Sequence, residues 1–297
     1  MPRKLIYFDR NVYSDIKVPL PATTADYDLI KRGIALGIIM IPGSLAVIEE
    51  ALPIYHVKSP TRFALEKQAY AELMDWKVFI KYHAVLLRDE IMAYVNNTPF
   101  TPFTSYNITP DDCFTTDHAQ SKQLKRMLPL IEAEKNKLSE GMKDVRENFE
   151  KGIKGIPQGK RKQLTVSSLW QTGAKLLARG YASSYGLDKL SEPQIEGLLN
   201  LRSLGSVIRY DIAYYYRKIR LGEQIKASDS RDHHHVALSA ATDIFITDDR
   251  HFAEILQFVP IQNYTVWSYK QFIKWLSITL AGWQAPDSYY ARPWAEK

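Results

Sequence analysis

Acidic residues follow or open short apolar segments at three places that are far apart in the chain. Lys4-Leu-Ile-Tyr-Phe-Asp9 is an apolar run that ends in an acid, and Asp232 precedes the segment His-His-His-Val-Ala-Leu. A second apolar run, Ile-Phe-Ile-Thr247, leads into Asp248 and Asp249. Carboxylate oxygens are the preferred ligands of hard divalent cations such as Mg²⁺ and Mn²⁺. If the fold brings these acids together, they form a metal site.

The elements around these acids predict the fold that would gather them. Residues 4–8 and 38–41 have the composition of buried strands, and 26–36 and 44–52 have the periodicity of helices, the second capped by Ser44. The β-α-β-α order predicts a parallel sheet in a three-layer α/β/α fold. Acids at the carboxyl ends of parallel strands then share one edge of the sheet. Glu49 and Glu50, on the helix after the second strand, would face the same edge.

The middle of the chain departs from this pattern. Residues 56–224 have mainly helical periodicity, including Trp76, Phe79 and Ile80, and we expect loops at 96–118 and 153–163. The α/β pattern returns near residue 232, with a strand at 264–267 and a helix capped by Ser268. We therefore predict a discontinuous α/β domain, 1–55 and 225–297, interrupted by a large all-helical insertion at 56–224.

Composition limits the class of protein. The 297 residues are 45% hydrophobic and 24% charged, as in a globular protein, and the formal net charge of +6 favours a polyanionic partner. The single cysteine, Cys113, excludes an intramolecular disulfide and a cysteine-based zinc site. No segment reads as a signal peptide or a membrane span, so we expect a cytoplasmic protein without membrane partners.

Three segments resemble the PIN-domain ribonuclease family, which includes toxins of the VapC type. They are Leu5-Ile-Tyr-Phe-Asp9-Arg-Asn-Val, Val47-Ile-Glu-Glu50-Ala-Leu, and the long segment from Asp232 to Phe252 with its Thr-x-Asp-x-x-Phe ending. The long helical segment has no counterpart in the compact toxins. The resemblance implies a PIN-like fold in which four acids hold the metal: Asp9, Glu50, Asp232 and Asp249.

The resemblance also implies roles around these four acids. Asn11 and Thr247 would support them by hydrogen bonds, and Asp229, Asp248 and Glu49 are auxiliary or alternative ligands. Each acid also has a purely structural interpretation. Asp9 and Asp248-Asp249 could form turns, Asp232 could cap a helix, and Glu49 and Glu50 could complement a helix dipole.

The function implied is metal-dependent hydrolysis of RNA with Mg²⁺ or Mn²⁺ as the cofactor, leaving 3′-hydroxyl and 5′-phosphate ends. A toxin or defence role, an inhibitory antitoxin-like partner and a homodimer are further expectations. Two alternatives stay open. One is a non-catalytic PIN-like protein that binds nucleic acid or acts as a scaffold, and the other is a structure-specific DNA nuclease.

Histidines and basic residues offer further contacts. Neighbouring residues of a helix point in different directions, so His233, His234 and His235 are poorly arranged to share one ion. We expect one to pack inward, one to lie near the acids and one to be exposed. Lys160, Arg161 and Lys162 are candidates for contact with an RNA backbone. The aromatic and basic residues around Tyr210 and Tyr214 are more typical of helical core packing than of base stacking.

Overall fold

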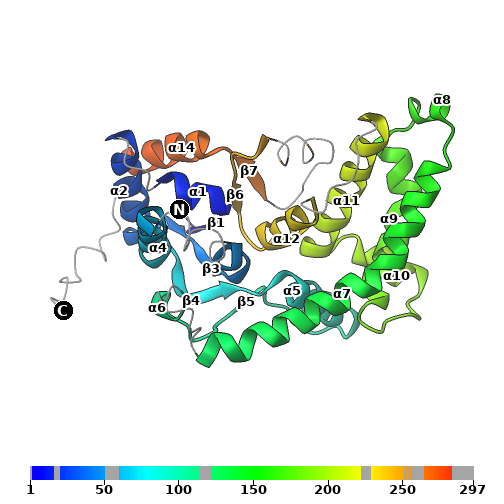
Figure 1. The fold of residues 1–297 in the computed structure, drawn as a ribbon, viewed down its shortest axis with the longest axis horizontal. Helices are drawn as coiled ribbons and strands as arrows, with labels where there is room; N and C mark the ends of the chain where they lie inside the picture. Colours follow the sequence, from blue (N-terminus) through cyan, green and yellow to red (C-terminus); the bar gives the residue numbers. More distant parts are fainter. Residues whose placement is uncertain are drawn as a thin grey trace.

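The computed structural model describes residues 2–16, 21–50, 60–113, 122–221, 229–250, 252, 255 and 264–282. Within these ranges it leaves out the side chains of 14–16, 21–24, 60–63, 122–125, 146, 153–154, 158, 220–221 and 229–232. The protein is an α/β protein that is mostly helical, with a central parallel sheet of four strands. Figure 1 shows the sheet flanked by α1, α2 and α14 on one side and by α12 on the other.

The central sheet has the strand order β2-β1-β6-β7, and all three pairings are parallel. The strands are β1 (Lys4–Phe8), β2 (Ile39–Met40), β6 (Ile244–Ile246) and β7 (Thr265–Trp267). Ile6, Tyr7 and Phe8 pair with Ile244, Phe245 and Ile246, and all six are buried. These continuous apolar runs suit a parallel sheet that is covered on both faces. The parallel sheet predicted from the sequence is therefore confirmed.

A second sheet of three strands lies beside the first, in the order β3-β4-β5. Its strands are β3 (Pro42–Ser44), β4 (Asp75–Ile80) and β5 (Phe103–Thr104). Gly43 pairs with Phe79, and a Cβ added at Gly43 would lie 2.5 Å from the Phe79 ring, so glycine is required there. The sequence predicts one strand at 38–41, whereas the structure has two short strands here, β2 in the first sheet and β3 in the second.

The expectation that residues 56–224 are all helical is wrong at β4 and β5. Trp76, Phe79 and Ile80 recur at helical spacing, but they lie on a six-residue strand. Aromatic and β-branched residues favour strands, and a short apolar run fits either period. Pairing with β3 decides between the two, and the sequence does not reveal that tertiary contact. The boundaries of the proposed insertion stay a prediction.

Four helices lie beside the sheets in the left-hand half of Figure 1: α1 (Arg10–Ile16), α2 (Pro21–Ala35), α4 (Pro60–Leu73) and α14 (Tyr269–Ala281). Residues 45–50 form a further helix, in which the backbone N–H of Val47 donates to Ser44 Oγ at 3.4 Å. Ser268 accepts from the backbone N–H of Gln271, and the Gln271 side chain bonds back to Ser268. Both predicted serine caps are therefore confirmed.

Except for α6 (Pro110–Cys113), which lies at the lower left, the remaining helices lie mainly in the right-hand half of Figure 1. They are α5 (His83–Val95), α6 (Pro110–Cys113), α7 (Lys122–Lys154), α8 (Gln158–Arg161), α9 (Val166–Ser183), α10 (Glu192–Leu198), α11 (Arg202–Leu221) and α12 (Asp229–Ser239). The mainly helical structure expected for 56–224 is confirmed by these helices and α4, over the residues that the structure describes. The loops expected at 96–118 and 153–163 are broken by β5, α6 and α8.

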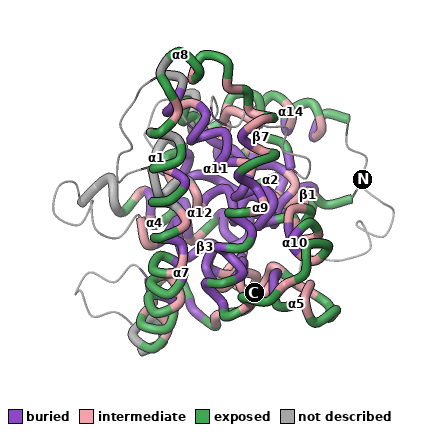
Figure 2. The backbone as a smooth tube through the Cα atoms, turned by 90° about the vertical axis from the view of Figure 1, so that its right-hand side faces the viewer, coloured by how far each residue is buried: buried purple, intermediate pink, exposed green. Residues whose placement is uncertain are grey.

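Buried residues run without interruption from the sheets into this helical half. Figure 2 shows buried segments concentrated in β3, α9, α11 and α12, with exposed residues along α7 and α8. Tyr210 and Tyr214 are buried and pack against each other. The core-packing interpretation of this aromatic stripe is therefore confirmed. Among the described helices, none combines the length and the apolar composition needed to cross a membrane.

Candidate metal centre

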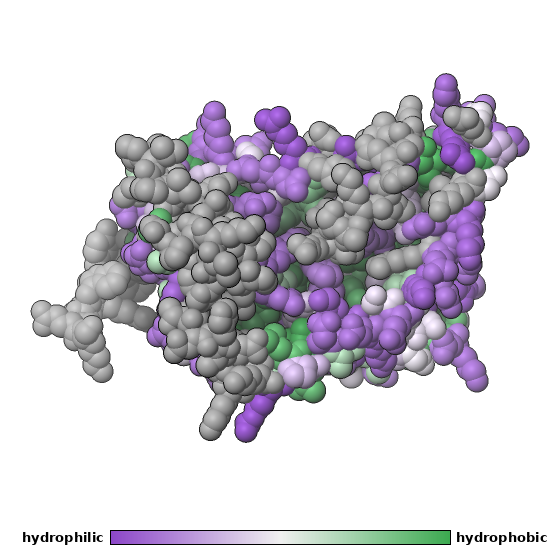
Figure 3. Space-filling model, viewed as in Figure 1, coloured by the Kyte–Doolittle hydropathy of each residue, from purple (hydrophilic) through white to green (hydrophobic). Residues whose placement is uncertain are grey.

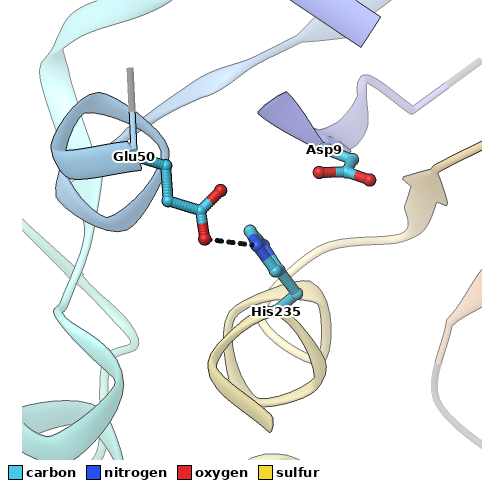
Figure 4. A group of neighbouring side chains, drawn as sticks. All are labelled: Asp9, Glu50 and His235. Atoms are coloured by element: carbon cyan, nitrogen blue, oxygen red, sulfur yellow. Dashed lines mark hydrogen bonds and ion pairs between the residues drawn. The ribbon is translucent and has the colours of Figure 1, made fainter. Parts of the chain in front are cut away.

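Three elements bring Asp9, Glu50 and His235 together at the carboxyl end of β1. Asp9 directly follows β1, Glu50 belongs to the helix 45–50, and His235 lies on α12. Each offers one ligand atom, and these three atoms all lie within 4.8 Å of one another. Figure 4 shows the three side chains converging from separate ribbons. Two carboxylates and one imidazole form a donor set that borderline divalent cations accept.

His235 is held on both of its ring nitrogens. Nε2 lies 3.2 Å from Glu50 Oε1, and Nδ1 lies 2.8 Å from the hydroxyl of Tyr7. Burial raises the pKa of Tyr7 well above its ordinary value, so this phenol stays protonated. A protonated phenol can donate to Nδ1 or accept from it, depending on the imidazole tautomer. If the Tyr7 oxygen accepts from Nδ1–H, Nε2 carries no proton. Its lone pair then points toward Glu50 and can bind a cation.

Asp9 is oriented by the strand that pairs with β1. Its backbone N–H donates to Ile246 O at 3.0 Å, and its Oδ2 accepts from the hydroxyl of Thr247 at 2.8 Å. Thr247 Oγ1 in turn accepts from the backbone N–H of Asp249 at 3.1 Å. Asp9 is 8% exposed and Thr247 is 3% exposed. The parallel pairing of β1 with β6 thus fixes one carboxylate through the residue that follows β6.

Glu49 and Glu50 point to different surroundings. Glu49 Oε2 accepts from the hydroxyl of Tyr82 at 2.9 Å, and its Oε1 lies 3.9 Å from Lys135 Nζ. Glu50 instead faces His235 and Asp9. Burial, followed by the charge of Glu49, raises the pKa of Tyr82, so its hydroxyl remains a donor. Of the two neighbours, the geometry places Glu50 at the candidate metal centre.

The structure does not bring Asp248 or Asp249 into the cluster. Both are exposed. Asp249 Oδ1 accepts from the backbone N–H of Phe252 at 3.1 Å, and Asp248 Oδ1 accepts from that of Tyr269 at 3.0 Å. Each acid therefore satisfies a backbone donor, which is the structural role open to a residue at a turn or helix start.

The other predicted residues are placed as follows. The first turn of α12 contains Asp229 and Asp232, whose side chains lie outside the described part of the structure. Because the helix begins at Asp229, Asp232 is not its cap. Asn11 is exposed on α1.

The basic residues proposed for RNA contact lie away from this cluster. Lys160 and Lys162 are exposed, and Arg161 donates to Ile156 O at 2.9 Å. Figure 1 shows α8 at the outer end of the helical half, and Figure 3 shows hydrophilic side chains gathered on the same side of the molecule. No described contact links these residues to Asp9 or Glu50.

The three consecutive histidines turn to three different partners, and none of them is exposed. His235 faces the cluster. The ring of His234 stacks on that of His83 at 3.5 Å, and His233 Nδ1 lies 2.8 Å from Asp211 Oδ1 without the alignment of a hydrogen bond. Burial, with the nearby histidines and Lys135, lowers the pKa of His234 well below its ordinary value. The expectation of one exposed histidine is wrong.

Comparison with protein-family models, curated proteins and solved structures finds no match to this chain. The residues themselves therefore carry the functional argument.

The expectation that one of the three histidines lies near the acids is confirmed, but the sequence did not identify it as His235, and the role of Tyr7 was missed. One signal could have found His235. It lies three residues after Asp232, which places both on one face of a helix. No comparable signal marks Tyr7, because its contact with His235 depends on how β1 lies against α12.

Proposed function

We propose that this protein is a metal-dependent nuclease that hydrolyses phosphodiester bonds of RNA. The observation that carries the proposal is the convergence of Asp9, Glu50 and His235 at the carboxyl end of a central parallel strand. In open α/β sheets this edge is the usual place for a ligand site. The resemblance to PIN-domain ribonucleases in the segments around Asp9, Glu50 and Asp232 agrees with this placement.

The residues present suit Mg²⁺ or Mn²⁺, with His235 favouring Mn²⁺. Asp9 and Glu50 would hold the cation through carboxylate oxygens, and His235 would hold it through Nε2. When bound, such a cation polarises the phosphate and lowers the pKa of a coordinated water. Mg²⁺ demands oxygen ligands in near-octahedral geometry, whereas imidazole also suits softer first-row ions.

The protein's own groups would prepare this chemistry by positioning. Thr247 holds one oxygen of Asp9, and Tyr7 holds the orientation of the His235 ring. In the hydrolysis, the water oxygen forms a bond to phosphorus while the bond from phosphorus to O3′ breaks. The O3′ oxygen takes a proton, which leaves a 3′-hydroxyl and a 5′-phosphate. RNA is the proposed substrate because the positive net charge favours a polyanion and the resembling family consists of ribonucleases.

The test is cleavage of end-labelled RNA and of DNA of the same sequence, each with Mn²⁺, with Mg²⁺ or with EDTA. Asp9→Asn and Glu50→Gln remove a charge from the cluster without changing its shape. Asp28→Asn removes a charge from an exposed position on α2 and serves as the matched control. We expect metal-dependent RNA cleavage that both cluster variants lose and the control retains.

One observation favours a second candidate, a PIN-like protein that binds nucleic acid without cleaving it. Asp249 is exposed and bonded to a backbone N–H, so the described residues bring together only two of the four predicted acids. The same assay separates the candidates. RNA binding with no cleavage under any metal condition would favour this second candidate, and preferential DNA cleavage would overturn the choice of RNA.

A further inference from the structure

A cavity of about 160 Å³ lies among α5, α7, α9, α11 and α12, beside the candidate metal centre. Leu87, Leu138 and Val207 form its apolar wall. Its remaining lining residues all carry a hydrogen-bond donor: His83, Lys135, Asn136, Ser139, Tyr181, His233 and His234. No carboxylate is among the lining residues. Three carboxylates contact lining residues: Asp211 accepts from the Tyr181 hydroxyl at 3.1 Å, and Glu49 and Glu132 lie 3.9 and 3.5 Å from Lys135 Nζ, so an anion in the cavity would compete with them.

The cavity and the metal centre share consecutive residues. His234 lines the cavity and His235 belongs to the cluster. Glu49, which precedes Glu50, lies 3.9 Å from Lys135 Nζ at the edge of the cavity. Tyr82 bonds to Glu49 through its hydroxyl, and its ring centre lies 4.5 Å from that of His83. A ligand in the cavity would therefore lie beside residues that are adjacent in the chain to two members of the cluster.

A second metal site is a poor explanation for this group of histidines. The rings of His83 and His234 stack at an interplanar angle of 16°, so their nitrogens lie in two parallel planes rather than converging. In the part of the chain that the structure describes, Asp9, Glu50 and His235 form the one group with metal-ligand spacing. Imidazole N–H groups and an ammonium are instead suited to an anion.

We propose that this cavity binds a phosphate group of the RNA backbone, next to the phosphate that is hydrolysed. This inference rests on the proposed nuclease function for its substrate. Lys135 would supply the charge, and His83 with the neighbouring donors would supply the directed hydrogen bonds. The backbone phosphates of a polynucleotide repeat along the chain, so a second phosphate pocket beside the cluster fixes which bond reaches the metal centre.

The experiment uses His83→Gln and Lys135→Gln, with Lys137→Gln as the control. Lys137 is exposed on the same helix as Lys135 and is not among the lining residues, so it matches the change in charge. Two probes are used in EDTA, where the proposed cleavage cannot occur. They are inorganic phosphate, followed by ³¹P NMR, and a fluorescent oligoribonucleotide, followed by anisotropy. Circular dichroism of each variant verifies folding, and Lys135, with its side chain 35% exposed, is the safer position if His83→Gln does not fold.

We expect both cavity variants to weaken phosphate and oligoribonucleotide binding by about ten-fold, the size of one charged hydrogen bond. Lys137→Gln should change phosphate binding and oligoribonucleotide binding by less than about two-fold each, because its charge is exposed and lies outside the cavity. With Mn²⁺ present, the cavity variants should raise KM and leave kcat nearly unchanged. Unchanged binding in folded Lys135→Gln, or a fall in kcat at constant KM, would overturn the phosphate pocket.

Two further outcomes separate this inference from the proposed function. If the cavity variants lose phosphate and oligoribonucleotide binding but no preparation cleaves RNA, the pocket stands and the nuclease proposal fails. If phosphate binding responds to the variants while oligoribonucleotide binding does not, the pocket takes a free phosphate compound and the RNA assignment is overturned.

Discussion

The two halves of this molecule position their polar groups in different ways. At the sheet edge, backbone pairing does the positioning, because Asp9 follows β1 and Thr247 follows β6 in the register that joins Phe8 to Ile246. In the helical half, buried side chains do it. Glu90 on α5 accepts from the backbone N–H groups of Ser203 and Leu204 at the start of α11.

This difference has a consequence for how each half responds to substitution. A side chain at the sheet edge can be changed with little loss of structure, because the strands are held by their own hydrogen bonds and apolar contacts. A buried polar side chain that caps a helix cannot be changed without loss of stability, because its removal leaves backbone N–H donors without a partner. We therefore expect substitutions at the sheet edge to affect chemistry, and substitutions such as those at Glu90 to affect stability.

The largest expected effect is on cleavage by Asp9→Asn. Loss of one ligand charge at a catalytic metal removes several kcal/mol of transition-state stabilisation, so we expect kcat/KM to fall by about a thousand-fold or more. Thr247→Val, which removes the hydroxyl that donates to Asp9 and accepts from the backbone N–H of Asp249, should lower kcat/KM by about ten- to a hundred-fold. Thermal melting of both variants should stay close to that of the unmodified protein. A large loss of melting temperature in Asp9→Asn would break the contrast between the halves.

The next effect is on stability, by Glu90→Ala. Glu90 is 4% exposed, and its removal orphans two backbone N–H groups, so we expect the free energy of unfolding to fall by about 3 kcal/mol. Glu90→Gln keeps a carbonyl acceptor and should cost less. Urea denaturation measures both. Equal losses of unfolding free energy in the two variants would show that Glu90 does not stabilise the protein by accepting these backbone hydrogen bonds.

Glu90 also predicts a pH dependence. Burial raises the pKa of this carboxyl in the folded protein, against the opposing effect of the Ser203 and Leu204 N–H groups. The folded state then binds a proton more tightly than the unfolded state, so stability rises as pH falls through the folded pKa toward the ordinary value. We expect the difference in stability between the protein and Glu90→Gln to change over that window. A difference that is constant with pH would contradict the raised pKa.

A third, smaller effect concerns the choice of metal. With His235 as a ligand, we expect Mn²⁺ to bind more tightly than Mg²⁺, and His235→Asp to reduce that preference by about ten-fold. Isothermal titration calorimetry with each ion measures the ratio directly, without requiring activity. A ratio that His235→Asp does not alter would remove His235 from the metal centre and leave the two carboxylates.

The positions of the polar groups at the sheet edge were easier to predict from the sequence than those in the helical half. Asp9 and Thr247 lie next to strands whose apolar runs are continuous, so their position follows from strand order alone. His235 was harder, because three adjacent histidines carry no local mark of which one turns toward the sheet. The direction depends on the rotation of α12 against β1 and α5, and packing sets that rotation.

The strand β4 and the cavity show where sequence patterns stop being informative. Trp76 and Phe79 suit either period, and the pairing of Gly43 with Phe79 selects the strand. The cavity combines residues from α5, α7, α9, α11 and α12, and no motif links His83 to Lys135 or His233. Residues on different helices that meet only through tertiary packing have no regular spacing in the sequence, so no sequence pattern predicts their contact.

The smallest expected effect is at the surface between α2 and α4, where Glu72 accepts from Lys31 Nζ at 2.8 Å and from the Tyr27 hydroxyl at 2.7 Å. These bonds lower the pKa of Glu72 to about 2. A lowered pKa contributes stability above the ordinary value near 4.5, and that contribution is lost as pH falls toward about 2. Because the Glu72 and Lys31 side chains are 30% and 49% exposed, solvent screening reduces the effect to less than about 1 kcal/mol. Glu72→Gln should therefore lower stability slightly at pH 7 and not at pH 2, as measured by urea denaturation at both values. A loss of stability at pH 7 as large as that of Glu90→Ala would show that an exposed ion pair stabilises this fold as strongly as a buried helix cap does. The proposed difference between the buried cap at Glu90 and the surface pair at Glu72 would then be wrong.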